Sequence, residues 1–234
     1  MTPADAWAAL PQRERQLILH VCRYWLTTID VLQRRLWADL SHDAVRKVVT
    51  RSVEKGWLAR HLLSGQEPYF VLGQKANSAL QLRRATKPLG HQALLDHYTV
   101  LLACARRGCD VFTEDEFRSQ FPDLSQPGVS AKHFFLDASS DPVRLGCFVV
   151  DHDKLSSRMV NKVGRRVGKV FATDRPSLRR LILDGQFAVH VVTATEGKRA
   201  NLQAAFARKP PLNVPVFVEA FPDELGDFFL VKRR

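Results

Sequence analysis

Apolar residues recur at helical spacing through the first part of the chain, which predicts short amphipathic helices. Residues 13–25 and 29–37 each carry one apolar stripe, and residues 41–55 carry a third. Ser41 is a good N-cap for the third helix, because its hydroxyl can accept a hydrogen bond from the first turn. Gly56 follows at the position where a left-handed residue ends a helix most easily. We therefore expect three helices joined by short connections.

The pattern then changes from helical to extended. Residues 57–59 and 69–72 read as two strands that flank a turn at residues 64–67. Residues 74–82 predict a small helix that packs back on the first three. Three helices followed by a hairpin predict a winged helix-turn-helix domain over residues 1–85.

The second part of the chain predicts a separate α/β domain. Pro88 and Gly90 disfavour a continuous helix, so we place the boundary there and the second domain at residues 91–234. Its predicted elements begin with a helix (91–108), a strand (110–113), a short acidic helical turn that starts at residues 114–116, and a hairpin (132–137 and 143–151). Two helices (156–171 and 175–183), a strand (187–193), a helix (196–207) and two strands (214–220 and 228–231) follow. The predicted fold class is α/β (α+β).

The net charge of the chain favours a polyanionic partner. Lysine and arginine number 35 against 24 aspartates and glutamates, for a net charge of +11, which favours salt-sensitive binding to a polyanion. Charge alone does not separate nucleic acid from an acidic membrane surface. No apolar run approaches the roughly 20 residues that span a bilayer, the first 15 residues lack a secretory pattern, and the four cysteines form no CxxC pair. We expect a cytoplasmic protein without a membrane partner.

The third helix is the candidate DNA-contacting element. It is basic on its polar side, and a major groove is wide enough to admit a helix. The alternative interpretations are a solvated helix beside an ordinary hairpin, or a winged helix that binds another protein. The predicted DNA-contacting residues are His42, Arg46, Lys47, Thr50, Arg51 and Lys55 on the helix, and His61, Ser64 and Gln66 on the hairpin.

Several segments together resemble a known family. The order TTIDVLQRRL, SHDAVRKVVTRSVEKGWLAR and PYFVLGQKANSAL resembles the winged helix-turn-helix of bacterial regulators. It is especially similar to the N-terminal part of the replication-relaxation family of plasmids and integrated mobile elements. This resemblance implies a transcriptional or replication regulator that binds specific double-stranded DNA as a homodimer. The helix at residues 91–108 is a candidate for contact between subunits, or for the core of the second domain.

The second domain resembles a degenerate restriction-endonuclease-like fold, which raises the alternative of a metal-dependent nuclease or relaxation enzyme. Such enzymes hold Mg²⁺ on an aspartate and on a second acid that lies two residues before a lysine. Here Asp151 is followed two residues later by Asp153, not by lysine. A nuclease would have to use Asp137, Asp151, Asp153 and Lys162. The incomplete motif favours an inactive relative, so we expect no enzymatic activity, no cofactor and no metal site.

Overall fold

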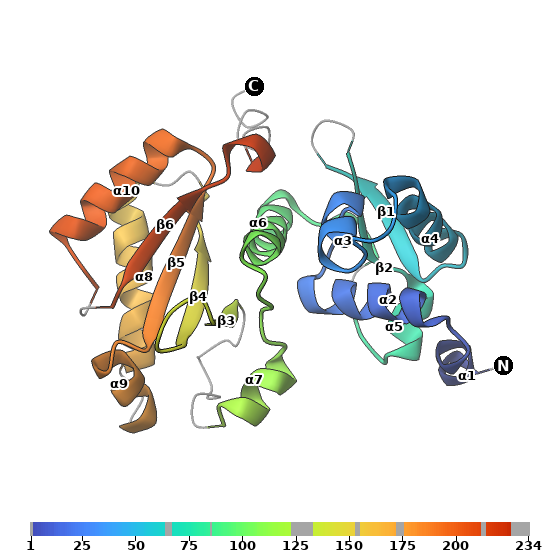
Figure 1. The fold of residues 1–234 in the computed structure, drawn as a ribbon, viewed down its shortest axis with the longest axis horizontal. Helices are drawn as coiled ribbons and strands as arrows, with labels where there is room; N and C mark the ends of the chain where they lie inside the picture. Colours follow the sequence, from blue (N-terminus) through green and yellow to red (C-terminus); the bar gives the residue numbers. More distant parts are fainter. Residues whose placement is uncertain are drawn as a thin grey trace. The chain divides into compact units, whose positions relative to one another are not determined.

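The chain divides into two compact units, residues 1–108 and 109–234, which are coloured along the sequence in Figure 1. The computed structural model describes residues 2–63, 67–84, 86–122, 133–152, 155–171, 176–211 and 214–225.

The first unit consists of helices and one two-stranded sheet. Its elements are α1 (Pro3–Ala8), α2 (Gln12–Tyr24), α3 (Ile29–Arg35), α4 (His42–Glu54), β1 (Leu58–Leu62), β2 (Pro68–Leu72), α5 (Gln74–Ala79) and α6 (His91–Arg107). The three helices and the hairpin predicted from the hydrophobic pattern are all present. Helix α1 was not predicted; it begins with a capping box, in which the side chains of Thr2 and Asp5 each accept from the other's backbone N–H.

Side-chain caps and one apolar core explain these helices. Thr28 Oγ1 accepts from Val31 N at the start of α3, and Ser41 Oγ accepts from Ala44 N at the start of α4. The apolar stripes of the helices and the inner face of the hairpin pack into one cluster. It includes Leu17, Ile18, Val21, Leu32, Trp37, Val45, Val49, Trp57, Leu58, Phe70 and Leu72.

Two glycines make the close passage between α4 and the hairpin possible. Gly56 adopts φ +76° after α4, the left-handed conformation that favours glycine. Gly73 follows β2, and its N–H donates to the Trp57 carbonyl at 2.8 Å. A Cβ built on Gly73 would lie 2.3 Å from the Gly56 carbonyl oxygen. No side chain fits at residue 73 unless the backbone moves.

The connector between the hairpin and α6 is packed against the first unit. The Arg84 guanidinium donates to the Cys22 carbonyl and lies 4.3 Å from the centre of the Trp25 ring. His61 Nε2 lies 2.9 Å from the Thr86 carbonyl oxygen, and Leu89 N donates to the Tyr69 hydroxyl. The connector is therefore part of the fold of this unit.

Helix α6 also belongs to the first unit, whereas the sequence analysis placed it in the second domain. The His97 ring stacks on Trp25 at 5.1 Å between centroids. Arg35 Nη1 donates to the Cys104 carbonyl at 2.9 Å. These contacts join α6 to α2 and α3, so the division of the chain lies after Gly108 and not at Pro88 to Gly90.

The second unit is a four-stranded sheet with helices. Its elements are α7 (Glu114–Gln120), β3 (Phe134–Asp137), β4 (Arg144–Val150), α8 (Ser156–Phe171), α9 (Pro176–Leu183), β5 (Phe187–Thr193), α10 (Glu196–Arg208) and β6 (Val216–Ala220). The strand order is β3-β4-β5-β6, with β3 and β4 antiparallel and the remaining pairs parallel. The strand expected at residues 110–113 is only a bridge, which pairs Val111 with Phe135. The strand expected at residues 228–231 lies outside the described residues.

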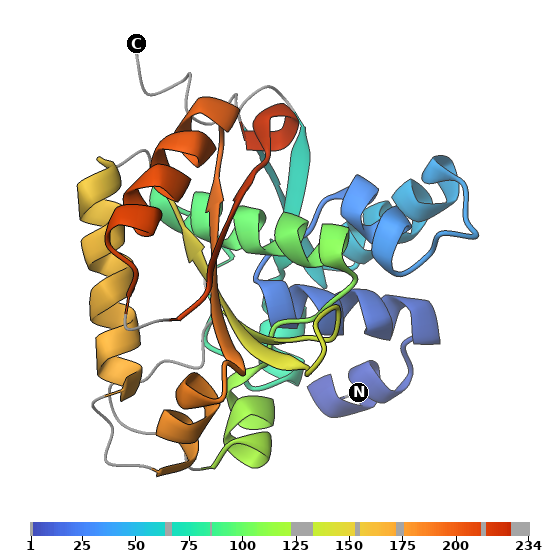
Figure 2. The same cartoon turned by 60° about the vertical axis from the view of Figure 1, so that its left-hand side comes forward.

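Helices α8, α9 and α10 lie on one side of this sheet (Figure 2). Their apolar side chains form a core with one face of the strands. The core includes Met159, Val163, Val167, Ile182, Leu202 and Phe206 from the helices, and Cys147, Val149, Val189, Val191 and Val218 from the strands. The protein thus has a mixed α/β fold with two sheets. Within the described residues, no helix combines the length and the apolar character that crossing a membrane requires.

Candidate functional site

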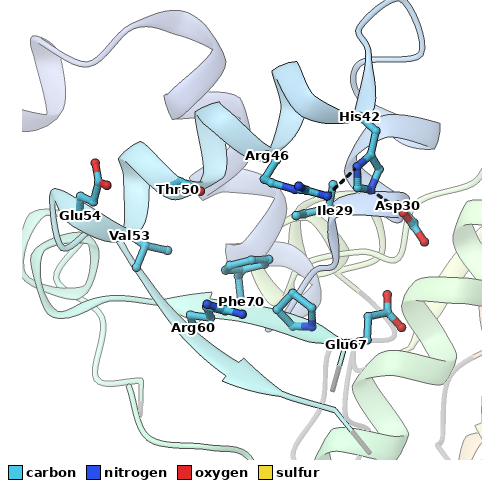
Figure 3. Close-up of a pocket in the computed structure, with 11 residues that line it drawn as sticks. Ile29, Asp30, His42, Arg46, Thr50, Val53, Glu54, Arg60, Glu67 and Phe70 are labelled. Atoms are coloured by element: carbon cyan, nitrogen blue, oxygen red, sulfur yellow. Dashed lines mark hydrogen bonds and ion pairs between the residues drawn. The ribbon is translucent and has the colours of Figure 1, made fainter. Parts of the chain in front are cut away.

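A pocket of about 580 Å³ lies in the first unit between α4, the start of α3 and the hairpin. Figure 3 shows α4 on one side of this pocket and β1 and β2 on the other. Its lining combines apolar side chains with charged groups of both signs. The lining residues are Ile29, Asp30, His42, Arg46, Thr50, Val53, Glu54, Arg60, Glu67, Pro68 and Phe70.

The packing of α4 decides which of its side chains face solvent. Val45, Val48 and Val49 are buried, so the helix turns its opposite side outward. Arg46, Lys47, Thr50 and Arg51 lie on that exposed side. The side chains of Lys47 and Arg51 have no ion-pair or hydrogen-bond partner among the described residues. This edge of α4 therefore offers two cations that the fold itself does not use.

A short polar chain positions Arg46 at one end of the pocket. His42 Nε2 lies 3.2 Å from Asp30 Oδ1, and Arg46 Nη2 lies 3.5 Å from His42 Nδ1 (Figure 3). Arg46 Nη1 is also 3.6 Å from Asp43 Oδ1 one turn earlier. These contacts restrain an arginine that is otherwise exposed to solvent. His42, Arg46 and Thr50 are the predicted site residues that the structure brings together in the pocket.

The hairpin contributes residues to the pocket that the sequence analysis missed. Arg60 on β1 pairs in register with Phe70 on β2, and both line the pocket. Since side chains alternate along a strand, Arg60 and His61 point to opposite faces of the hairpin. His61 contacts the Thr86 carbonyl and packs its ring 5.5 Å from Tyr69. The alternation of residues 58–62 could have identified Arg60 as the wing residue that faces α4.

Lys55, another predicted DNA-contacting residue, forms an ion pair within the first unit. Lys55 Nζ lies 3.2 Å from both carboxylate oxygens of Glu14, a residue that is buried in α2. The structure thus gives Lys55 a role within the fold. Ser64 and Gln66 lie outside the described residues.

Glu67, in the lining of the pocket, makes the stability of the first unit depend on pH. Partial burial, and secondarily the charge of Asp30, raise the pKa of Glu67 above its ordinary value of 4.5. The folded protein then holds this proton more tightly than the unfolded chain, so this group lowers the free energy of unfolding as pH rises through its folded pKa. We expect Glu67→Gln to stabilise the first unit slightly at neutral pH. Thermal unfolding at several pH values should show the difference vanish below pH 4.5, and a constant difference would contradict the assignment.

The residues of the nuclease alternative do not form one site. Asp137 pairs in register with Arg144 at the start of β4, whereas Asp151 follows the end of β4. Lys162 Nζ donates to the Val150 carbonyl at 3.1 Å, and Asp153 lies outside the described residues. Asp137, at the end of β3, therefore lies beside the start of β4, whereas Asp151 lies just past the end of β4.

Each of these aspartates has its own partners, which the sequence analysis missed. Asp151 is buried; its Oδ2 accepts from the Thr193 hydroxyl at 3.2 Å and lies 3.8 Å from Lys198 Nζ. These contacts hold the end of β4 to β5 and α10. Tertiary placement alone brings these residues together, and no local sequence signal reveals it.

A buried histidine links the other aspartate to β6. His190 Nε2 lies 3.6 Å from Asp137 Oδ2, and His190 Nδ1 lies 3.7 Å from Glu219 Oε1. The imidazole thus lies between two carboxylates. In the described part of the chain, no group of three or more His, Cys, Asp or Glu side chains is arranged to hold a metal ion.

The excess positive charge of the chain lies mainly in the first unit. Residues 1–108 contain 16 lysines and arginines against 8 aspartates and glutamates, whereas residues 109–234 contain 19 against 16. The unit that carries α4 and the hairpin is therefore the more attractive one for a polyanion. No known protein family, curated protein or solved structure matches the chain.

Proposed function

We propose that the chain is a sequence-specific double-stranded DNA-binding protein, a transcriptional or replication regulator of a bacterial mobile element. The observation that carries this proposal is the exposed cationic edge of α4 beside the hairpin. In the proposal, the first unit is a winged helix-turn-helix, α3 and α4 are the helix-turn-helix pair, and the hairpin is the wing.

The chemistry of α4 suits a major groove. A helix enters this groove with one face, and its side chains then reach base edges and phosphates. Arg46 and Thr50 line the pocket and are the proposed base readers. Lys47 and Arg51 are the proposed phosphate contacts, because they are exposed and the fold does not use them.

The carboxylates of the pocket limit where phosphate can lie. Asp30, Glu54 and Glu67 line the same pocket as Arg46 and Arg60. A phosphate placed among three carboxylates would be repelled, whereas a carboxylate can accept from the exocyclic amino group of cytosine. The proposed arrangement therefore directs the phosphate backbone toward Lys47 and Arg51, and base edges toward the pocket.

The test is DNA binding by the full-length protein as a function of salt. The probes are DNA from the region upstream of its own gene and a scrambled duplex of equal length. We expect Arg46→Ala/Arg51→Ala to weaken binding to the upstream DNA by about 100-fold, since a base contact contributes about 1–3 kcal/mol and a phosphate contact adds to it. The preference for upstream over scrambled DNA should fall as well.

A matched control separates this effect from a general loss of charge. Arg13→Ala/Arg118→Ala removes two exposed cations of α2 and α7, and neither residue is part of α4 or the hairpin. This control should bind nearly as well as the wild type. Equal binding by the control and the α4 variant would contradict the assignment of α4 as the recognition helix.

The proposal extends to a homodimer and to the fold of the second unit. A dimer would read two half-sites about 34–36 Å apart, or a multiple of that distance. An antiparallel pair (β3 and β4) that leads through α8 to a parallel strand supports a restriction-endonuclease-like core. The separation of Asp137 from Asp151 supports a core without nuclease activity.

A further inference from the structure

The charges of the second unit are segregated along the chain. Residues 156–209, which span α8, α9, β5 and α10, contain 12 lysines and arginines but only 3 aspartates and glutamates. The rest of this unit, residues 109–155 and 210–234, contains 7 against 13. These three helices lie on one side of the sheet (Figure 2), so the positive charge of a nearly balanced unit is concentrated in the segment that contains them.

Helix α8 concentrates this charge into a row. Arg158, Arg165 and Lys169 are exposed and follow one another at intervals of seven and four residues. At about 1.5 Å of rise per residue, they lie about 10 Å and 6 Å apart along nearly one line of the helix. Residues 156–171 contain no aspartate or glutamate. No described residue pairs with the side chains of Arg158 or Lys169, and Arg165 Nε contacts only the carbonyl of Asn161 in its own helix.

A fourth cation joins the row from the C-cap of α10. Lys209 Nζ lies 3.5 Å from Asn161 Oδ1, one turn from both Arg158 and Arg165. Two other cations of α8 serve the fold instead. Lys162 Nζ donates to the Val150 carbonyl, and the Arg166 guanidinium lies 5.7 Å from the centre of the Phe134 ring.

We propose that Arg158, Arg165, Lys169 and Lys209, the α8 row, bind the phosphate backbone of DNA as a second contact separate from α4. The partner follows from charge complementarity, because duplex DNA carries one negative charge per about 1.7 Å of its axis. The inference rests on the proposed function in that it takes DNA as the polyanion. The α8 row would add a contact to DNA of any sequence, because phosphates carry no base information.

An acidic membrane surface fits the α8 row less well than DNA. A helix that lies on a membrane inserts large apolar side chains between its cations. In α8, Met159, Val163 and Val167 are fully buried in the core, and residues 156–169, whose side chains the structure describes, expose no large apolar side chain. Beside the row lie Asn161, Gly164 and Gly168, and a Cβ added to either glycine would meet no other atom within 4 Å. The surface beside the row is therefore polar and has few protruding side chains, so a phosphate backbone can approach it closely.

The test compares two full-length variants that lose the same charge. Arg158→Ala/Arg165→Ala/Lys169→Ala removes three cations of the row, and Arg13→Ala/Arg15→Ala/Arg118→Ala removes three exposed cations elsewhere. Binding to the upstream and scrambled duplexes is measured from low to moderate salt. Since each phosphate contact contributes about 0.9 to the slope of log K against log salt, the row variant should lower the slope by about 2 to 3. It should weaken both duplexes about equally, by at least 10-fold at the lower salt.

The outcomes separate this inference from the proposed function. An unchanged preference with a reduced slope in the row variant supports the α8 row, whatever the α4 variant does. A slope equal to that of the charge-matched control overturns the α8 row, even if the α4 variant has lost specific binding. Binding to phosphatidylserine vesicles that falls in the row variant, with DNA binding unchanged, also overturns it. Circular dichroism of both variants should match the wild type, because the replaced side chains are exposed.

Discussion

Replacing Gly73 with alanine should destabilise the first unit by about 3 kcal/mol, at the upper end of the usual cost of overpacking. The new Cβ would lie 2.3 Å from the Gly56 oxygen and 2.9 Å from the carbonyl carbons of Gly56 and Trp57. All three atoms belong to the backbone, so no rotamer change can relieve the contact. The hairpin would have to move away from the end of α4, and we expect specific DNA binding to be lost with it.

The chain provides a matched control and its own probe for this experiment. Gly90 is also the N-cap of a helix with extended backbone angles, but a Cβ there meets nothing within 4 Å. Like Gly73→Ala, the Gly90→Ala variant replaces an N-cap glycine with alanine, but it creates no steric clash. The four tryptophans, Trp7, Trp25, Trp37 and Trp57, all lie in the first unit. Their fluorescence during denaturant unfolding reports on this unit, and equal midpoints for the two variants would contradict the steric argument.

Replacing Lys55 with alanine should destabilise the first unit by about 2–3 kcal/mol, because it leaves the Glu14 carboxylate buried without its cation. Breaking a buried ion pair from one side costs about 3–5 kcal/mol. The Glu14 side chain is only 3% exposed, but that of Lys55 is 44% exposed, so water can replace part of the lost interaction. The expected cost of Lys55→Ala therefore lies at or just below the lower limit of that range.

Replacing both partners tests whether Lys55 serves the fold or the ligand. Glu14→Leu/Lys55→Met removes the carboxylate together with its cation, and it should recover most of the stability that Lys55→Ala loses. If Lys55 acts within the fold, the double variant should bind the upstream DNA nearly as well as the wild type. A stable double variant with binding as weak as that of Arg46→Ala/Arg51→Ala would return Lys55 to the DNA-contacting residues.

Local patterns predicted the elements of this fold well. Periodicity and caps placed α4 and β5 nearly to the residue, because the apolar stripe of α4 and the uninterrupted apolar run of β5 each match one type of element. Helix α1 was missed because its capping box precedes only a few residues without a clear stripe. The strand expected at residues 110–113 is reduced to one bridge, because Thr113 caps α7 directly after it.

The sites were predicted less completely, because sequence does not reveal which charges the fold neutralises. Arg46 and Lys55 are both basic residues of the predicted third helix, yet one lines a pocket and the other contacts the buried Glu14 carboxylate. Asp137 and Asp151 are the two aspartates that a nuclease would need, but the strand register places Asp137 beside the start of β4 and Asp151 past its end. His190 looked like part of an ordinary buried strand, because its carboxylate partners come from β3 and β6.

The contacts of Trp25 also determine where the chain can be cut. This ring touches the Arg84 guanidinium and the His97 ring, so it joins the end of α2 to the connector and to α6. A fragment that ends at residue 88 would keep α4 and the hairpin but would lose His97, the Leu89 donor to Tyr69 and the Cys104 acceptor of Arg35. A fragment that ends at Gly108 would retain all of these contacts. We therefore expect the fragment that ends at Gly108 to fold on its own, and the fragment that ends at residue 88 to be less stable.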